Sequence, residues 1–178
     1  MRRLRIFGVI GWTNSGKTTL IERLVRHLRA DGLRVSTVKH AHHGFDLDRP
    51  GKDSYRHREA GAEEVLISAA GRWALLRELP EGEEASLATL LERLTPVDLV
   101  LVEGFKGDPH PKLEVIRVEE GAPLRTTAAE GVRAYVSNEP SRIVDLAAGL
   151  PVFGREAIGA IAGFVFEHAA APGDLRTG

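Results

Sequence analysis

The chain has 178 residues, of which 43% are apolar and 28% are charged, so it fits a compact globular fold and excludes intrinsic disorder over most of its length. Lys and Arg number 24 against 25 Asp and Glu, a net charge of -1, which argues against a nucleic-acid binder working through a broad basic face. There is no cysteine, which excludes disulfide bonds, thiolate metal sites and a cysteine nucleophile, and fits a reducing cytoplasm.

The first elements are predicted to be a strand, a helix and a second strand. Residues 4–10 form a short apolar run that ends at Gly11, as in a strand buried on both faces of a parallel sheet. Apolar residues then recur at helical spacing over residues 20–28, and residues 33–38 form the next strand. The crossover of such a βαβ unit is right-handed, and both strands end at one edge of the sheet. No apolar segment is long enough to span a bilayer, so we expect no membrane association.

The remaining elements extend this pattern and add a hairpin. Residues 39–51 are polar and rich in turn formers, and they predict a loop at the carboxyl edge of the sheet. We then expect a helix over 54–60, hairpin strands over 64–68 and 73–78, a helix over 85–94, strands over 97–102, 113–118 and 132–137, and a C-terminal helix over 154–171. The predicted fold class is α/β, a mostly parallel twisted sheet flanked by helices with an additional β-hairpin. Residues 1–171 should form a single domain, followed by a flexible tail over 172–178.

The segment GWTNSGKT matches the pattern G-x-x-x-x-G-K-[ST], and it lies between a predicted strand and a predicted helix, as that pattern requires. Its glycines let backbone N–H groups converge on phosphate oxygens, and the helix N-terminus adds partial positive charge. Lys17 is expected to reach the terminal phosphates and Thr18 to ligate Mg²⁺. The sequence therefore predicts a P-loop NTPase whose nucleotide contacts include Gly11, Trp12, Thr13, Asn14, Ser15, Gly16, Lys17, Thr18 and Thr19.

Glu103 ends a strongly apolar strand, where α/β folds collect groups that face the ligand. A carboxylate there can hold Mg²⁺ through water, so Lys17 and Glu103 are the predicted catalytic residues. Asp53 opens a helix after the second strand and is the third predicted Mg²⁺ residue beside Thr18 and Glu103, with plain N-capping as its alternative. Asp98 begins the strand that Glu103 ends, so we expect it at the opposite edge as a solvated residue.

The loop after the second strand carries three histidines and two aspartates: His40, His42, His43, Asp46 and Asp48. Imidazole and carboxylate together can hold a transition metal, although the spacing is not that of an ordinary zinc site. We expect nucleotide or substrate contacts from this loop, made by His40 and Asp48, and we expect the loop to order when GTP and Mg²⁺ bind. A dedicated metal site and a solvated loop are the alternatives.

Asn138 follows a predicted strand, where guanine-specific P-loop proteins often present side chains to the base. It is a predicted nucleotide contact, but the signature Asn-x-x-Asp is absent, and a turn residue before Pro140 is an equal alternative. Trp73 and Phe105 are expected to pack in the core or an interface rather than to stack on a base.

Four segments, GWTNSGKTTL, KHAHHGFDLDRPGKDSYRHREAGA, RWALLRE and DLVLVEGFK, together resemble the MobB family of molybdopterin-guanine dinucleotide biosynthesis proteins. The resemblance covers most of the chain, and its most distinctive part is the block that begins at Lys39. It implies a homodimeric GTP-binding P-loop protein with weak GTPase activity. Such a protein assists a MobA-type guanylyltransferase in attaching GMP to molybdopterin. The expected cofactors are GTP and Mg²⁺.

Three other functions stay open beside this one. The chain could be an enzyme that transfers phosphate or ligates with a nucleoside triphosphate, as in folds like dethiobiotin synthetase. It could be a metallochaperone GTPase that uses its histidines, or a nucleotide-gated adaptor that acts by binding partners. The predicted hairpin bears on the oligomeric state, because a lone hairpin is marginal in water and exposes its edges. We therefore expect it to pair with its copy across a two-fold axis.

Overall fold

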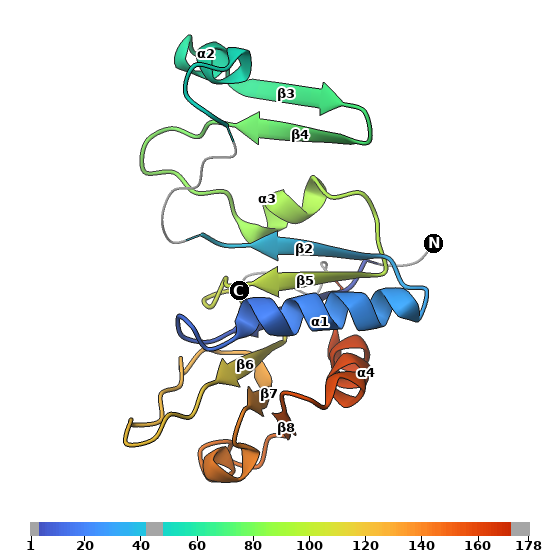
Figure 1. Cartoon of the computed structure of the whole chain (residues 1–178), viewed down its shortest axis with the longest axis vertical. Helices are drawn as coiled ribbons and strands as arrows, with labels where there is room; N and C mark the ends of the chain where they lie inside the picture. Colours follow the sequence, from blue (N-terminus) through green and yellow to red (C-terminus); the bar gives the residue numbers. More distant parts are fainter. Residues whose placement is uncertain (1–3, 42–47, 172–178) are drawn as a thin grey trace. The chain divides into compact units, whose positions relative to one another are not determined.

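The computed structural model describes residues 4–41 and 48–171. The chain forms two compact units: one comprises the chain up to residue 40 and again from residue 87, and the other comprises residues 41–86 (Figure 1). The glycine-rich segment at residues 11–18, called the phosphate loop below, belongs to the first unit. Whether both units act as a single domain over residues 1–171 stays a prediction, and the expected tail over 172–178 lies outside the described residues.

The first unit is built on a six-stranded sheet in which every strand pairing is parallel. The sheet order is β2-β5-β1-β6-β7-β8, so β1 lies between β5 and β6. The strands are β1 (Ile6–Ile10), β2 (Val35–Lys39), β5 (Leu99–Glu103), β6 (Lys112–Ile116), β7 (Val132–Ser137) and β8 (Val152–Gly154). All their carboxyl ends meet at one edge, where the phosphate loop begins after β1. The predicted fold class, an α/β P-loop NTPase with a mostly parallel sheet and an extra hairpin, is confirmed.

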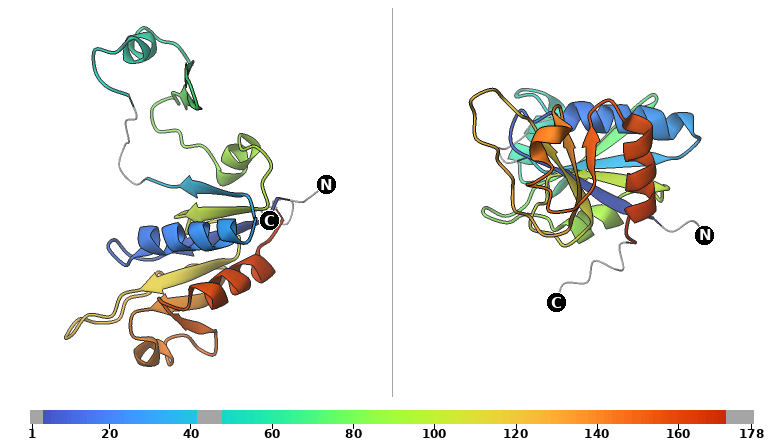
Figure 2. Two further views of the ribbon diagram at one scale, coloured as in Figure 1. Left: turned by 45° about the vertical axis from the view of Figure 1, so that its right-hand side comes forward. Right: turned by 90° about the horizontal axis from the view of Figure 1, so that it is seen from below.

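Helices cover both faces of this sheet. α1 (Lys17–Ala30) and α4 (Ile158–His168) pack together on one face, where Leu24 and Ile161 are fully buried (Figure 2). α3 (Leu87–Glu92) buries Leu87 against the other face. A short 3₁₀ helix, η1 (Pro140–Ile143), packs beside β7 and β8. The regularly spaced apolar residues of α1 are therefore buried against the sheet, as the sequence predicts. Their burial holds the helix in place, and with it the phosphate loop that precedes the helix.

The second unit consists of a short helix and a β-hairpin. α2 (Asp53–Glu59) precedes β3 (Glu64–Ala69), which pairs antiparallel with β4 (Arg72–Arg77), so the predicted hairpin is confirmed. Arg58 of α2 donates to the carboxylate of Glu78 at 2.6 Å, which ties the helix to the end of the hairpin. The hairpin exposes large apolar side chains, among them Leu66 at 62% and Trp73 at 66% of their surface. Trp73 is therefore not a core residue of this chain.

Two details of the sequence prediction are wrong. The sequence predicts a helix over 154–171, whereas residues 152–154 form strand β8 and α4 begins only at Ile158. The pattern of a three-residue strand is too short to recognise beside a long apolar helix. Asp98 is buried rather than solvated, and its carboxylate accepts a hydrogen bond from the backbone N–H of Arg34 at 2.8 Å. Over the described residues, no helix is both long enough and apolar enough to cross a membrane.

Candidate functional site

The phosphate loop adopts a tightly curled backbone between β1 and α1. Gly11, Asn14 and Gly16 have positive φ angles of 145°, 61° and 99°. A side chain at Gly11 would run into the backbone carbonyl oxygen of Val115, so only glycine fits there. Positive-φ residues in such a loop aim several backbone N–H groups at one point, which makes a nest for an anion. α1 follows directly, and its first turn contains no acidic residue. The partial positive charge at the N-terminus of the helix is therefore not neutralised by the protein itself.

Lys17, the first residue of α1, folds back across this loop. Its Nζ donates hydrogen bonds to the carbonyl oxygens of Gly11 at 3.1 Å and Trp12 at 2.8 Å. Burial lowers the pKa of Lys17; the carboxylate of Glu103 opposes this shift, and the positive charges of Lys106 and Lys39 add to it. The ammonium group is thus held over the nest by neutral carbonyls, where a phosphate would supply the counter-charge that these partners lack.

Glu103 lies beside the phosphate loop at the end of β5. Its Oε1 accepts a hydrogen bond from Nζ of Lys39, the last residue of β2, at 3.0 Å. The residues that follow the two strands continue the contact: a side chain at Gly104 would collide with Cβ of His40, and the ring of Phe105 lies 4.8 Å from the ring of His40. Phe105 packs against the apolar layer under α3, as expected. The structure therefore brings Glu103 and His40 to the same edge as Lys17.

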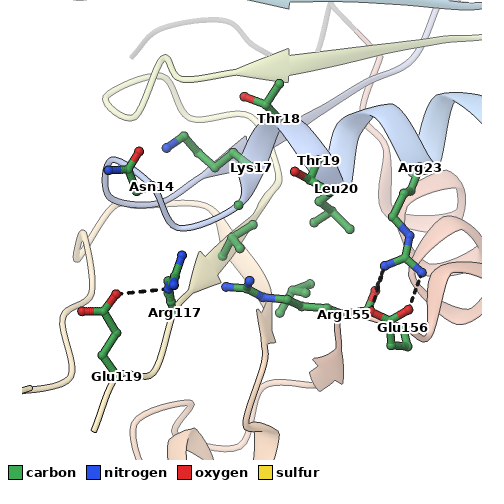
Figure 3. Close-up of a pocket in the computed structure, with 13 residues that line it drawn as sticks. Asn14, Lys17, Thr18, Thr19, Leu20, Arg23, Arg117, Glu119, Arg155 and Glu156 are labelled. Atoms are coloured by element: carbon green, nitrogen blue, oxygen red, sulfur yellow. Dashed lines mark hydrogen bonds and ion pairs between the residues drawn. The ribbon is translucent and has the colours of Figure 1, made fainter. Parts of the chain in front are cut away.

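A cavity of about 780 Å³ opens on the other side of the phosphate loop (Figure 3). Its loop side is lined by Asn14, Lys17, Thr18 and Thr19. Its far side comes from the strands beyond β1 and from the segments that follow them, with the apolar side chains of Val115 and Val136 and the charged side chains of Arg117, Glu119, Arg155 and Glu156. The cavity therefore joins the phosphate nest to a partly apolar recess, which is the combination that a nucleotide needs.

Arg155 connects the two sides of this cavity. It follows β8, and its Nη2 donates a hydrogen bond to the backbone carbonyl oxygen of Ser15 at 2.6 Å. Burial, and then the positive charge of Arg117, lower the pKa of Arg155. Arg117 pairs with Glu119 at 3.1 Å, whereas no carboxylate in the described part of the chain pairs with Arg155. Its Nε and the Oγ of Ser15 are buried without a hydrogen-bond partner. A partly desolvated cation with an unused donor is suited to a polar or anionic ligand.

Arg23 and Glu156 brace this wall of the cavity. The guanidinium of Arg23 donates to both carboxylate oxygens of Glu156, at 3.1 and 2.7 Å, and also to the backbone carbonyl oxygen of Arg155 at 3.0 Å. The hydrogen bond from Arg23, and then its charge, lower the pKa of Glu156. A bidentate pair has a fixed geometry, so α1 orients the segment that carries Arg155.

The structure also describes three other predicted ligand residues, Asn138, Asp48 and Asp53. Both polar atoms of the Asn138 side-chain amide bond to the backbone of Val118: Oδ1 accepts from its N–H at 2.8 Å, and Nδ2 donates to its carbonyl oxygen at 3.0 Å. In the second unit, Asp48 accepts hydrogen bonds from the backbone N–H of Arg49 at 2.9 Å and from the hydroxyl of Ser54 at 2.8 Å. Asp53 is the exposed first residue of α2, and the N-cap position before it is occupied by Lys52, so the N-capping alternative for Asp53 is wrong. The ligand roles of these residues stay predictions.

The predicted histidine loop is only partly described. His40 is placed beside Glu103, whereas His42, His43 and Asp46 lie outside the described residues. Among the residues that are described, no group of three His, Cys, Asp or Glu side chains could hold a metal ion. The metal alternative for this loop is therefore untested at the residues on which it depends.

The sequence analysis missed the arginines of the cavity, Arg23, Arg117 and Arg155. Arg117 directly follows β6 and Arg155 directly follows β8. The rule that singled out Glu103, a charged residue at the carboxyl end of a parallel strand, did not find Arg117, because the sequence predicts a strand over 113–118 and so places Arg117 inside it. Arg155 could not be found in this way, because β8 itself was not predicted.

Comparison with known proteins gives one consistent family. The family described as MobB, Molybdopterin guanine dinucleotide synthesis protein B, matches residues 6–138. The molybdopterin-guanine dinucleotide biosynthesis adapter protein of Haemophilus influenzae is 42% identical over 142 residues, which cover 79% of each chain. The adapter protein of Escherichia coli is 44% identical over 108 residues, covering 60% of this chain and 62% of the relative. A crystal structure of Bacillus subtilis MobB superimposes with a TM-score of 0.71 at 28% identity, covering 93% of this chain and 98% of that one. Since the family match spans more than half of the sequence and the fold agrees, the chain belongs to the MobB family.

Proposed function

We propose that this protein is a GTP-binding adapter in the synthesis of molybdopterin-guanine dinucleotide, with weak GTPase activity. The relatives from Haemophilus influenzae and Escherichia coli carry the name of an adapter protein of that synthesis. The observation that carries the nucleotide part is the placement of Lys17 over the curled backbone of the phosphate loop, next to a cavity of about 780 Å³. A phosphate nest that opens into a partly apolar recess supports a nucleoside triphosphate rather than a free phosphate ion.

The cavity suggests where the nucleoside binds. Leu20, Val115 and Val136 are core residues that form the apolar floor of the cavity, and Arg155 stands between this floor and the phosphate loop. A guanidinium group is planar and carries several donors, so it can stack on a base and hydrogen-bond to a ribose or base oxygen. We assign the nucleoside contact to Arg155 and the phosphate contacts to residues 11–19. The preference for guanine over adenine comes from the family resemblance.

The oxygen ligands at the site fit Mg²⁺. Thr18 presents an exposed hydroxyl at the start of α1, and Glu103 presents a carboxylate at the end of the neighbouring strand; both are hard ligands that Mg²⁺ prefers. When bound with the nucleotide, Mg²⁺ would neutralise charge between the β and γ phosphates. Glu103 is paired with Lys39 at 3.0 Å, so one of its carboxylate oxygens is already occupied and is not free to position a water molecule. This pairing supports slow hydrolysis, which suits an adapter whose state depends on its nucleotide.

The adapter role requires partners. We propose a MobA-type guanylyltransferase and molybdopterin as partners, a cytoplasmic location, and a homodimer formed through the hairpin of β3 and β4. The exposed Leu66 and Trp73 support the dimer, because an apolar hairpin surface of this kind usually meets a second protein surface.

Calorimetric titration with GTP, ATP and CTP in the presence of Mg²⁺, with and without the guanylyltransferase, tests this proposal. We expect GTP to bind more tightly than ATP or CTP, and hydrolysis to stay slow in the absence of the partner. Binding of none of the three nucleotides would contradict the nucleotide part. Transfer of phosphate to a small acceptor would favour an enzyme like dethiobiotin synthetase, and stoichiometric binding of a soft divalent metal would favour a metallochaperone.

A further inference from the structure

A second cavity, of about 320 Å³, adjoins the phosphate loop at residues 12–15. It shares Asn14, Val115, Arg117 and Glu119 with the larger cavity, and its other walls include Trp12, Pro123 and Arg125. The proposed function leaves this cavity without a role. Its volume falls in the range of small-molecule sites, which begins at about 300 Å³.

Two cations flank the exposed tryptophan of this cavity. Trp12 exposes 48% of its surface; Nζ of Lys106 lies 5.4 Å and the guanidinium carbon of Arg125 lies 5.8 Å from the centre of its ring. Neither cation has an ion pair with a carboxylate among residues 4–41 and 48–171. Two positive charges near one ring repel each other, and an anion bound close to both cations would relieve this repulsion.

A buried lysine fixes the segment that carries Lys106. Lys112 of β6 is fully buried, and its Nζ donates hydrogen bonds to the carbonyl oxygens of Lys106 at 3.4 Å, Asp108 at 2.5 Å and Glu130 at 2.8 Å. These three bonds tie the chain after β5 to the turn before β7. Lys106 is therefore anchored through its own backbone.

A buried glutamate fixes the segment that carries Arg125. Glu114, two residues along β6 from Lys112, is also fully buried. Its carboxylate accepts hydrogen bonds from the hydroxyl of Thr126 at 2.7 Å and from the backbone N–H of Thr127 at 2.5 Å. The carbonyl oxygen of Thr126 in turn accepts a hydrogen bond from Nε1 of Trp12 at 3.4 Å. Arg125 is thereby held against the phosphate loop.

The burial of Lys112 and Glu114 is consistent with a binding site at the segments that they hold. Burying a charged side chain is costly unless hydrogen bonds compensate, and a fold can fill such positions with apolar residues instead. Residues 112 and 114 share one face of β6, and both are used to position surface segments that bring unpaired cations to one ring. An arrangement in which rigid backbone holds two unneutralised charges is pre-organised for an anion.

We propose that Trp12, Lys106 and Arg125 form a second anion site, which binds the phosphate group of a small phosphorylated molecule beside the nucleotide. The site rests on the proposed function only in that the neighbouring cavity is taken to hold the nucleotide. Arg125 lines the cavity and can meet the phosphate group directly, Lys106 adds positive charge at the same ring from outside the cavity lining, and the indole edge and Pro123 offer apolar contact to the rest of the molecule. Its position at residues 12–15 puts a phosphorylated molecule next to the nucleotide phosphates, as an adapter that presents two ligands to a third protein requires.

Fluorescence of Trp12 tests this site directly. The chain has two tryptophans, so Trp73→Phe leaves Trp12 as the only reporter. This variant is titrated with phenyl phosphate, inorganic phosphate and phenol, each with and without saturating GTP and Mg²⁺. We expect a saturable change with phenyl phosphate that persists in the presence of GTP and is absent with phenol. Equal affinities for phenyl phosphate and inorganic phosphate would identify a free phosphate ion as the ligand, and tighter binding of phenyl phosphate would identify an organic phosphate.

Substitution of the two cations completes the test. In the Trp73→Phe background, Lys106→Ala with Arg125→Ala should weaken phenyl phosphate binding at least about tenfold, because charge-assisted contacts are lost. Arg142→Ala removes an exposed arginine of η1 outside both cavities, and it should leave the affinity for phenyl phosphate unchanged. No saturable response, an unchanged affinity in the double variant, or loss of the response on adding GTP would overturn the second site. If GTP fails to bind while the Trp12 response is intact, the proposed function fails and the second site stands.

Discussion

Replacement of Arg155 by alanine probes the link between the phosphate loop and the nucleoside recess. A hydrogen bond that involves a charged group contributes about 1.5–3 kcal/mol, which corresponds to a loss of roughly 10- to 150-fold in affinity. Arg117 already disfavours the charge on Arg155, so removing Arg155 relieves some repulsion and the loss should fall near the lower end. We therefore expect GTP to bind about tenfold more weakly to Arg155→Ala.

Calorimetric titration with two ligands distinguishes a nucleoside contact from a phosphate contact. GTP and inorganic tripolyphosphate, each with Mg²⁺, are titrated into the wild type, Arg155→Ala and Arg155→Lys. Arg142→Ala serves as the matched control, because it removes an arginine outside the cavity. The account predicts a loss for GTP with little loss for tripolyphosphate, and only partial recovery in Arg155→Lys, since an ammonium group lacks the planar fork. Unchanged GTP affinity in a folded Arg155→Ala protein, or an equal loss for tripolyphosphate, would refute the assignment.

Three further predictions concern hydrolysis, stability and assembly. Glu103→Gln should slow Mg²⁺-dependent GTP hydrolysis more than it weakens GTP binding; normal turnover would contradict the role, and a loss confined to Asp53→Ala would move the acid to that residue. Burial, and then the charge of Lys112, lower the pKa of His110 from 6.5 to about 4, so the folded state resists protonation while the unfolded state accepts it. Stability should therefore fall as the pH drops from 6.5 towards 4, by up to about 3 kcal/mol in urea titrations, and His110→Asn should remove this part of the dependence; an identical pH profile in that variant would refute it. Light scattering at micromolar concentration should show a dimer that Leu66→Ser with Trp73→Ser converts to a monomer; a monomeric wild type would contradict the role of the hairpin.

Local sequence predicted the elements that form one side of the candidate site. The phosphate loop lies within a single strand-loop-helix unit, so its glycines, Lys17 and the spacing of α1 are all contained in about 30 consecutive residues. Glu103 was found by the same reasoning, because an unbroken apolar run marks β5 and its end. These features depend on near neighbours and on the rule that parallel strands end at one edge.

The opposite side of the site depends on residues that are distant in the chain. Arg155 reaches the carbonyl oxygen of Ser15 across 140 positions of the sequence, and nothing in the local pattern near either residue predicts this contact. Lys112 and Glu114 occupy a strand of alternating charged and apolar residues, which normally indicates that one face meets water. In the structure both faces of this strand are buried, because the segments after β5 and after β6 cover the charged side. Only the tertiary structure shows that Lys112 and Glu114 are buried and hydrogen-bonded rather than exposed to water.

The most direct test of the central claim is the affinity of Lys17→Ala for GTP and Mg²⁺, measured by calorimetry on protein whose thermal unfolding matches that of the wild type. The account predicts at least about a tenfold loss, because Lys17 makes the charge-assisted contact to the terminal phosphates. Arg142→Ala should bind GTP as the wild type does. Equal affinity of the wild type and a folded Lys17→Ala protein would contradict the assignment of residues 11–18 as the phosphate-binding loop.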